Sequence, residues 1–255
     1  MKTTKKLNFI EWNNGILISS IKNIDLNIIL IIILDFLFYI SSGYLFIFWL
    51  QRVQAKMTAF NIPTDITALG VEKAQQLVSD VKAFYFLIIA SLVLLLTAII
   101  FLMSIFKGII WAKTTGTKTT FKLISKFLAL NLIWAGFWFV VVFLVSYLVE
   151  PAAAPMAMLV AVILALYFTN TLYALFMRKQ QFKSILGAIK LNIAKIHLFL
   201  LPYSAIGLLL FIIVRLLSLF KFQYSSILLG LVLIVYAAAV RYYVSNLVYE
   251  IEKLK

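Results

Sequence analysis

The 255-residue sequence has no cysteine, one histidine, and only nine acidic residues against 23 lysines and arginines. The absence of cysteine excludes disulfides, thiolate metal sites and a cysteine nucleophile. The single histidine, His197, follows a segment, 178–196, that contains no carboxylate. Local residues therefore cannot complete a metal site around it. We expect neither a metal nor another cofactor.

The scarcity of acids also argues against an enzyme. The segments 107–126 and 178–196 contain no Asp or Glu. The segments expected on the other side of a membrane from these two contain the acids Asp65, Glu72, Asp80 and Glu150 but no histidine. Catalysis needs a nucleophile, acid–base groups or metal ligands gathered at one depth. We therefore expect no catalytic residues.

Apolar residues, in contrast, make up 64% of the chain, and the mean hydropathy is +1.07. Soluble domains are about 45–50% apolar. Six stretches exceed the ~20 apolar residues that a helix needs to cross ~30 Å of hydrocarbon, and they lack the alternation of membrane strands. The predicted fold is all-α, a polytopic bundle of six transmembrane helices forming one domain over 1–255. The predicted spans are 24–50, 83–106, 127–149, 153–177, 197–218 and 225–247.

The net charge of +14 would suggest nucleic acid in a soluble protein, but here the lysines flank the spans. Alternate sides of the membrane carry sixteen and five Lys and Arg residues. The positive-inside rule then predicts a cell-membrane protein with cytoplasmic termini, cytoplasmic segments 107–126 and 178–196, and no nucleic-acid partner.

Anionic lipids of the inner leaflet are the partner expected for these cytoplasmic lysines, since each nearby Lys or Arg gains ~1 kcal/mol there. A protein partner or an ATPase at segments 107–126 and 178–196 is the alternative. The residues assigned to this contact are Lys118, Lys122, Lys126, Arg178, Lys179, Lys183 and Lys190.

Two of these basic stretches are similar to each other. KTTFKLISKFLALN (118–131) and KQQFKSILGAIKLN (179–192) share six residues of fourteen at an offset of 61, and a fainter copy begins at Asn14. Each copy leads into a span, which indicates three tandem units, at about 14–106, 118–177 and 179–247. Each unit would be an interfacial amphipathic helix, a span outward and a span back. In the external loop, 51–82, we expect turns over 61–70, followed by a helix over 71–84 that rests on the outer surface and leads straight into the second span.

Some polar groups fall inside the predicted spans. Asp35 and Arg241 lie at similar depth, ~10–15 Å below the cytoplasmic surface, and are interpreted as an ion pair locking the first and sixth spans. Coupling of protons or substrate is the alternative. Asn170 and Thr171 are expected to bond between helices or to line a small polar cavity.

The fourth span carries small residues at every fourth position. Such a stripe lets a neighbouring helix approach closely, and the sixth span is a candidate neighbour. The residues are Ala153, Ala157, Ala161 and Ala165.

The segments FKLISKFLALN, FKSILGAIKLN and ILISSIKNIDLN give the chain a plan that resembles poorly characterised six-helix membrane families of prokaryotes. That resemblance implies membrane location. Gly187 with Leu201 and Pro202 is similar to part of the coupling loop of permease subunits of ATP-driven transporters, although Gln181, Phe182 and Lys183 replace its acidic start. The expected function is a non-enzymatic membrane protein acting through its basic cytoplasmic face on lipid or a partner; the alternative is a permease subunit.

Overall fold

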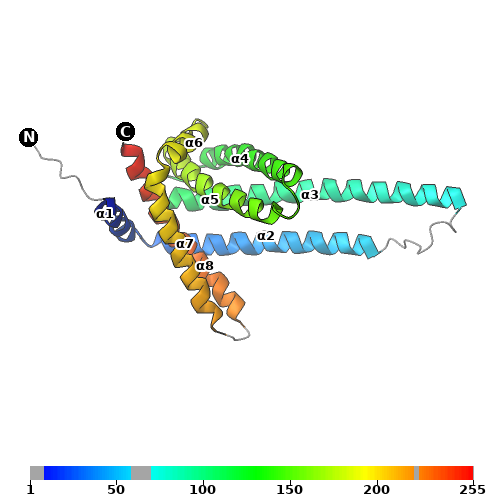
Figure 1. The fold of residues 1–255 in the computed structure, drawn as a ribbon, viewed down its shortest axis with the longest axis horizontal. Helices are drawn as coiled ribbons and strands as arrows, with labels where there is room; N and C mark the ends of the chain where they lie inside the picture. Colours follow the sequence, from blue (N-terminus) through cyan, green and yellow to red (C-terminus); the bar gives the residue numbers. More distant parts are fainter. Residues whose placement is uncertain (1–8, 59–69, 221–223, 255) are drawn as a thin grey trace, which may run out of the picture.

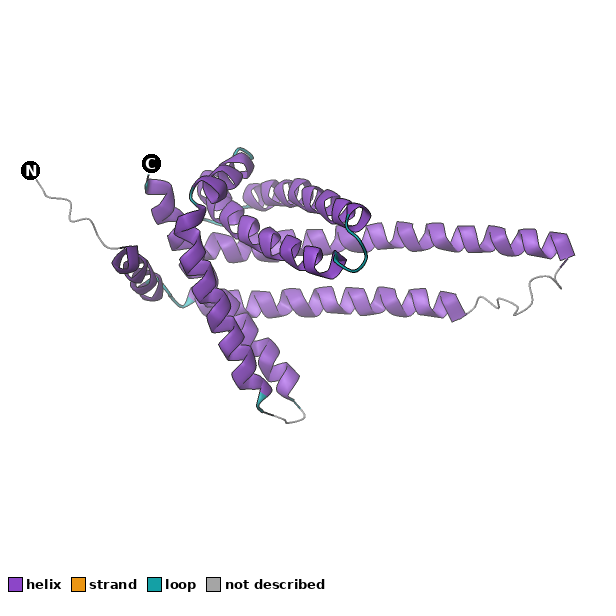
Figure 2. Cartoon of the chain, viewed as in Figure 1, coloured by secondary structure: helices purple, strands orange, loops and turns teal. Residues whose placement is uncertain are grey.

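The computed structural model describes residues 9–58, 70–220 and 224–254, and the regular elements of these residues are all α-helices (Figure 2). Six helices are long and apolar enough to cross a membrane, which confirms the predicted class of fold. The lysines of 1–8 and the turns predicted over 61–69 lie outside the described residues. The six long helices are α2 (Asn27–Thr58), α3 (Gly70–Thr114), α4 (Phe121–Leu148), α5 (Ala154–Lys179), α7 (Ile196–Ser218) and α8 (Ser225–Lys253); the shorter ones are α1 (Phe9–Lys22) and α6 (Ser184–Ala194).

The long helices form three hairpins, α2–α3, α4–α5 and α7–α8 (Figure 1). One end of the molecule, which we call the terminal end, contains α1, the last turns of α8, and α6. From there the α7–α8 hairpin diverges from the other two. The C-terminal ends of α2, α4 and α7 lie away from the terminal end.

The buried core lies at the terminal end. Residues 171–177 of α5 are all buried there, and Phe127, Phe199 and Val248 pack with them from α4, α7 and α8. Farther along the helices the apolar side chains are exposed; Leu94, for example, is 71% exposed. Lipid provides no hydrophobic drive for helices to associate, so close packing and hydrogen bonds must hold them together. The contacts of this core hold the three hairpins together at the terminal end.

The second span is longer than predicted at both of its ends. At 1.5 Å per residue, the 45 residues of α3 extend about 68 Å, more than twice the ~30 Å of hydrocarbon. The helix predicted over 71–84 is the first part of α3 and leads straight into the span as expected, but it continues the line of the span and does not lie across the surface (Figure 1). Its neighbour α2 runs beside it, where Trp49 Nε1 donates to Ser91 Oγ at 3.0 Å.

Helix α1 buries one face and leaves many apolar residues exposed on the other. Asn13, Ile16 and Ser20 are buried against the bundle, and Ser20 accepts a hydrogen bond from Asn246 of α8 at 3.1 Å. Ile18 and Ile21 on the other face are more than half exposed. Such exposed apolar side chains suit contact with the apolar part of a bilayer.

Helix α6 also has a buried face and exposed apolar residues. Ser184, Ala188 and Asn192 are buried at intervals of four residues, so they form one face of the helix. Leu186 and Ile193 are exposed on the other side, at 72% and 63%. Both short helices thus pack on the core by one face and leave apolar side chains exposed on the other.

The second unit differs from the prediction of a separate interfacial helix. Residues 121–131 are the first three turns of α4, which continues unbroken to Leu148. The Thr120 side chain caps its start by accepting from the Leu123 N–H at 3.2 Å. Leu123 and Phe127 are buried in the core, which holds the segment parallel to the span.

Candidate functional site: a buried charge cluster and a basic face

Asp35 lies against Arg241 and also against Lys107, a partner that the sequence did not indicate. Arg241 donates to both carboxylate oxygens, with Nη2 3.2 Å from Oδ1, and Lys107 Nζ donates to Oδ1. Asp35 is fully buried, and the side chains of Lys107 and Arg241 are only 13% and 11% exposed. One carboxylate therefore joins α2, α3 and α8 through two cations.

Lys107 was assigned to a loop because the second span was predicted to end at 106. In the structure α3 continues to Thr114, and Gly108, Ile110 and Trp111 are buried beyond the lysine. The apolar run around Lys107 was the signal that the helix continues. The rings of Phe38 and Tyr39 flank its ammonium group at 4.8 and 5.0 Å, a favourable position for a cation.

The enclosed geometry of this cluster matches a lock between helices. A proton or substrate pathway needs a group that solvent or substrate can reach, and the Asp35 carboxylate has no exposed surface. Its two oxygens are occupied by three hydrogen bonds from fixed cations. The cluster keeps one positive charge in excess.

The equivalent asparagines of the second and third units, Asn131 and Asn192, form a second set of polar contacts, both directed at α5. Tyr173 donates its hydroxyl to Asn131 Oδ1 at 2.7 Å, and Asn131 donates to Ser104 of α3 at 2.9 Å. Thr171 donates to Asn192 Oδ1 at 2.8 Å. Each asparagine thus ties the start of its unit to α5.

These bonds decide the role of Thr171, which was expected to bond between helices or to line a cavity. It is fully buried and bonded to α6, so it joins helices. Asn170, the neighbouring candidate, is half-buried. In the fainter first copy, Asn27 instead donates to Asp25 next to it in the chain.

Asp25 connects the start of α2 to α8. Tyr242 donates its hydroxyl to Asp25 Oδ1 at 2.9 Å, and the Asn27 N–H donates at 3.1 Å. Burial raises the pKa of Asp25, but the hydrogen bonds together outweigh it and hold the pKa below its usual value. This contribution to stability is present above the usual pKa of an aspartate and is lost as the pH falls through the lower, folded-state pKa.

The two basic loops meet on the surface of the terminal end. Lys126 Nζ donates to the Gln180 carbonyl at 3.3 Å, and Thr117 donates to the Met177 carbonyl at 3.3 Å. The chain turns sharply there because Gln180 has a left-handed backbone, with φ of 52°. We call the resulting surface the basic face; it comprises exposed Lys118, Lys122, Lys179, Lys183 and Lys190 and half-buried Lys126.

Exposed aromatic rings accompany these lysines at equivalent places in the two units. Phe121, beside Lys122, is 89% exposed, and Phe182, beside Lys183, is 44% exposed. A ring next to a lysine suits the lipid headgroup boundary, since the ring enters the apolar layer while the ammonium remains among phosphates.

Arg178 does not belong to the basic face, contrary to the expectation from sequence. It donates to the Ser245 carbonyl of α8 at 2.9 Å and lies over the Tyr249 ring at 4.3 Å. Lys179 is exposed but pairs with Glu252. The cause in both cases is α8, which continues to Lys253 and brings acceptors beside the end of α5.

The small-residue stripe of α5 is buried at one of its four positions. Ala161 is 7% exposed, Ala157 and Ala165 are half-buried and Ala153 is exposed. One turn after Ala165, Thr169 accepts a hydrogen bond from Trp134 of α4 at 2.8 Å. This contact is with α4, and α5 also lies against the sixth span, α8, as expected.

Comparison of the chain with models of known families, with curated proteins and with solved structures finds no match. The function must therefore be inferred from the geometry of the chain itself. That geometry combines a multi-pass helix bundle, a buried charge cluster that joins three helices, and an exposed basic face at the terminal end.

Proposed function

We propose that this protein is a non-enzymatic integral membrane protein that binds anionic lipid headgroups of the inner leaflet through its basic face. In this proposal the terminal end is cytoplasmic, since that side carries sixteen Lys and Arg residues against five on the other. The headgroups of the inner leaflet are anionic and attract such clusters.

The observation that carries the proposal is the joining of the two basic loops into one surface. Separate loops would each offer three of these lysines, whereas the contact between Lys126 and Gln180 brings the two loops together. Phe121 and Phe182 remain exposed beside the lysines, although a soluble protein would bury such rings. Charge and exposed rings together match a membrane surface better than water.

The burial of polar residues inside the bundle supports the same proposal. A permease would place Asp35 or Thr171 along a polar cavity between its halves, but both are fully buried in hydrogen bonds. The buried residues of the terminal end form a continuous apolar core. Such packing suits a protein that acts by its surface.

The test is to count bound lipids by native mass spectrometry of the full-length protein in mild detergent, titrated with phosphatidylglycerol or phosphatidylcholine. Four lysines of the basic face are changed together to glutamine. Each is worth ~1 kcal/mol near an anionic surface, so phosphatidylglycerol binding should weaken at least tenfold while phosphatidylcholine binding stays the same. The variant combines Lys118→Gln, Lys122→Gln, Lys183→Gln and Lys190→Gln.

A matched control removes four exposed cations from the opposite end of the molecule. It has the same change in charge, so a non-specific effect of net charge would appear equally in both variants. We expect less than twofold weakening in the control; equal losses, or no loss in either, would contradict the proposal. The control combines Arg52→Gln, Lys56→Gln, Lys73→Gln and Lys82→Gln.

A permease subunit is the second candidate, and α6 is the observation that favours it. This helix of 11 residues lies in a loop between two spans, as the coupling helix of such subunits does, and it contains Gly187. Its face with Ser184 and Asn192 is buried, so docking would have to use the exposed face around Leu186. Affinity purification in mild detergent tests it; an ATPase recovered at a one-to-one ratio would replace the first proposal.

A further inference from the structure

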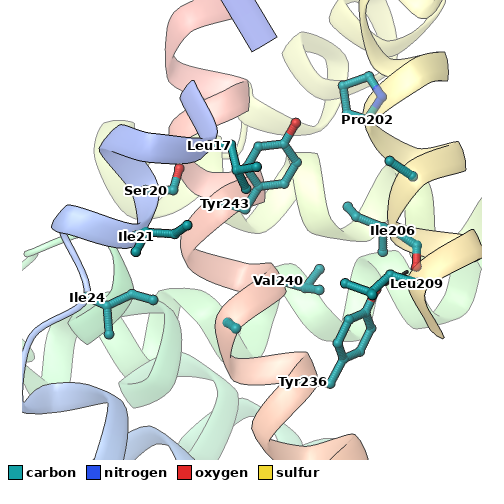
Figure 3. Close-up of a pocket in the computed structure, with 12 residues that line it drawn as sticks. Leu17, Ser20, Ile21, Ile24, Pro202, Ile206, Leu209, Tyr236, Val240 and Tyr243 are labelled. Atoms are coloured by element: carbon teal, nitrogen blue, oxygen red, sulfur yellow. Dashed lines mark hydrogen bonds between the residues drawn. The ribbon is translucent and has the colours of Figure 1, made fainter. Parts of the chain in front are cut away.

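We propose that the groove between α1, α7 and α8 holds one acyl chain of a membrane phospholipid. The groove has a volume of about 290 Å³. In Figure 3, α8 forms its floor with Val240 and Tyr243, α1 forms one wall with Ile21, and α7 forms the other with Ile206 and Leu209. The proposal requires that α7 and α8 span the membrane; it does not depend on the basic face.

The chemistry of the lining selects hydrocarbon. Ser20 donates to the Ile16 carbonyl at 2.7 Å and accepts from Asn246, so its hydroxyl is already used. Tyr236 donates to the Ile206 carbonyl at 2.6 Å (Figure 3). The rest of the described lining below Tyr243 is aliphatic. A polar ligand would lose its water without gaining partners, whereas an acyl chain loses nothing.

The length and orientation of the groove match a lipid tail in one leaflet. From Tyr243 to Tyr236 the floor rises about 10 Å along α8, within the ~15 Å that half of a ~30 Å hydrocarbon layer provides. The Tyr243 hydroxyl points toward the terminal end, away from Tyr236 (Figure 3). Tyrosine is typical of the headgroup boundary, so Tyr243 marks the end at which the tail meets its headgroup.

The groove opens to the bilayer. On its rims, Leu17, Ile21 and Leu209 are 46%, 60% and 51% exposed. A flexible tail fills such a space and supplies the van der Waals contacts that the walls would otherwise lack. The acyl chain of the lipid would fill the gap between α1 and α7.

The experiment uses the full-length protein in phosphatidylcholine vesicles that contain a phosphatidylcholine with a photoreactive diazirine on one tail. After irradiation, mass spectrometry maps the labelled residues. We expect Ile206, Leu209 and Val240 to be labelled at least fivefold more than Leu94, which is more exposed but lies on an open helix surface. Labelling of the groove at or below the level of Leu94 would overturn the proposal, and so would cross-links between two protein copies there.

Filling the groove tests occupancy independently. Ala205→Phe and Ala239→Phe each place a ring in the space, and labelling of the remaining groove residues should fall at least threefold. The control, Ala90→Phe, adds the same ring at an exposed alanine of α3 and should change nothing. Unchanged labelling in both filled variants would refute a bound tail. The vesicles contain no anionic lipid, so this result is separate from the fate of the proposed function.

Discussion

Replacing Asp35 with asparagine removes the carboxylate that faces both Lys107 and Arg241. The amide keeps the shape of the side chain, but two cations, only 13% and 11% exposed, lose their counter-charge. Removing one partner of a buried ion pair costs about 3–5 kcal/mol. At 2–4 °C for each kcal/mol, we expect the unfolding midpoint to fall by about 6–20 °C.

Loss of either cation should destabilise the protein less than loss of the Asp35 carboxylate, because the two remaining charges balance. Lys107→Met leaves the neutral pair of Asp35 and Arg241, with two of the three hydrogen bonds intact. Arg241→Met leaves the neutral pair of Asp35 and Lys107 but removes both guanidinium bonds. The order of destabilisation should be Asp35→Asn, then Arg241→Met, then Lys107→Met at about 0–1 kcal/mol, since the last variant leaves no uncompensated buried charge and keeps the guanidinium bonds.

The assay is the loss of the monodisperse peak in fluorescence-detected size-exclusion chromatography after heating, at one protein and detergent concentration. Asp80→Asn, on the exposed part of α3, is the matched control and should not move the midpoint. If Asp35→Asn leaves the midpoint unchanged, or if Lys107→Met lowers it equally, the cluster does not lock these helices through balanced charge.

Three further predictions test the packing and the orientation. Asn131→Ala leaves the buried Tyr173 hydroxyl without its hydrogen-bond acceptor and removes the donor to Ser104, so it should cost about 1–3 kcal/mol by the same heating assay. Gly108→Val should cost about 1–3 kcal/mol, because even a Cβ would lie 2.8 Å from a side chain of α4, whereas Gly136→Ala, in open space, should stabilise slightly; equal effects would count against close packing there. The chain has no cysteine, so an impermeant maleimide applied to intact cells should label Lys82→Cys and spare Lys183→Cys; the opposite pattern would reverse the proposed topology.

The fold was largely predictable because spanning a bilayer is a property of each helix alone. An apolar run of sufficient length must form a helix in lipid, since its backbone groups have no other partners. Charge at the ends of those runs predicted the orientation, which the cysteine experiment tests. Depth along a helix follows from residue number, and this was enough to match Asp35 with Arg241.

Contacts between helices were harder to predict from the sequence. Lys107 was predicted to be a loop residue because its charge was taken to end the span. In the structure, Asp35 and two aromatic rings accommodate the lysine inside the bundle. Arg178 counted as a surface residue because its acceptor, the Ser245 carbonyl, lies on another helix. The first turns of α4 counted as an interfacial helix because lysines recur there.

By itself, then, the sequence determined how many helices are long and apolar enough to cross a membrane, where in the chain they lie, and which connecting segments are basic, because hydropathy and charge act on each segment separately. Only the tertiary structure decided that the two basic loops share one face, that α5 receives an asparagine from each of two units, and that α1, α7 and α8 enclose a groove. Those features depend on which helix faces which, and that is set by close packing of side chains that lie far apart in the chain.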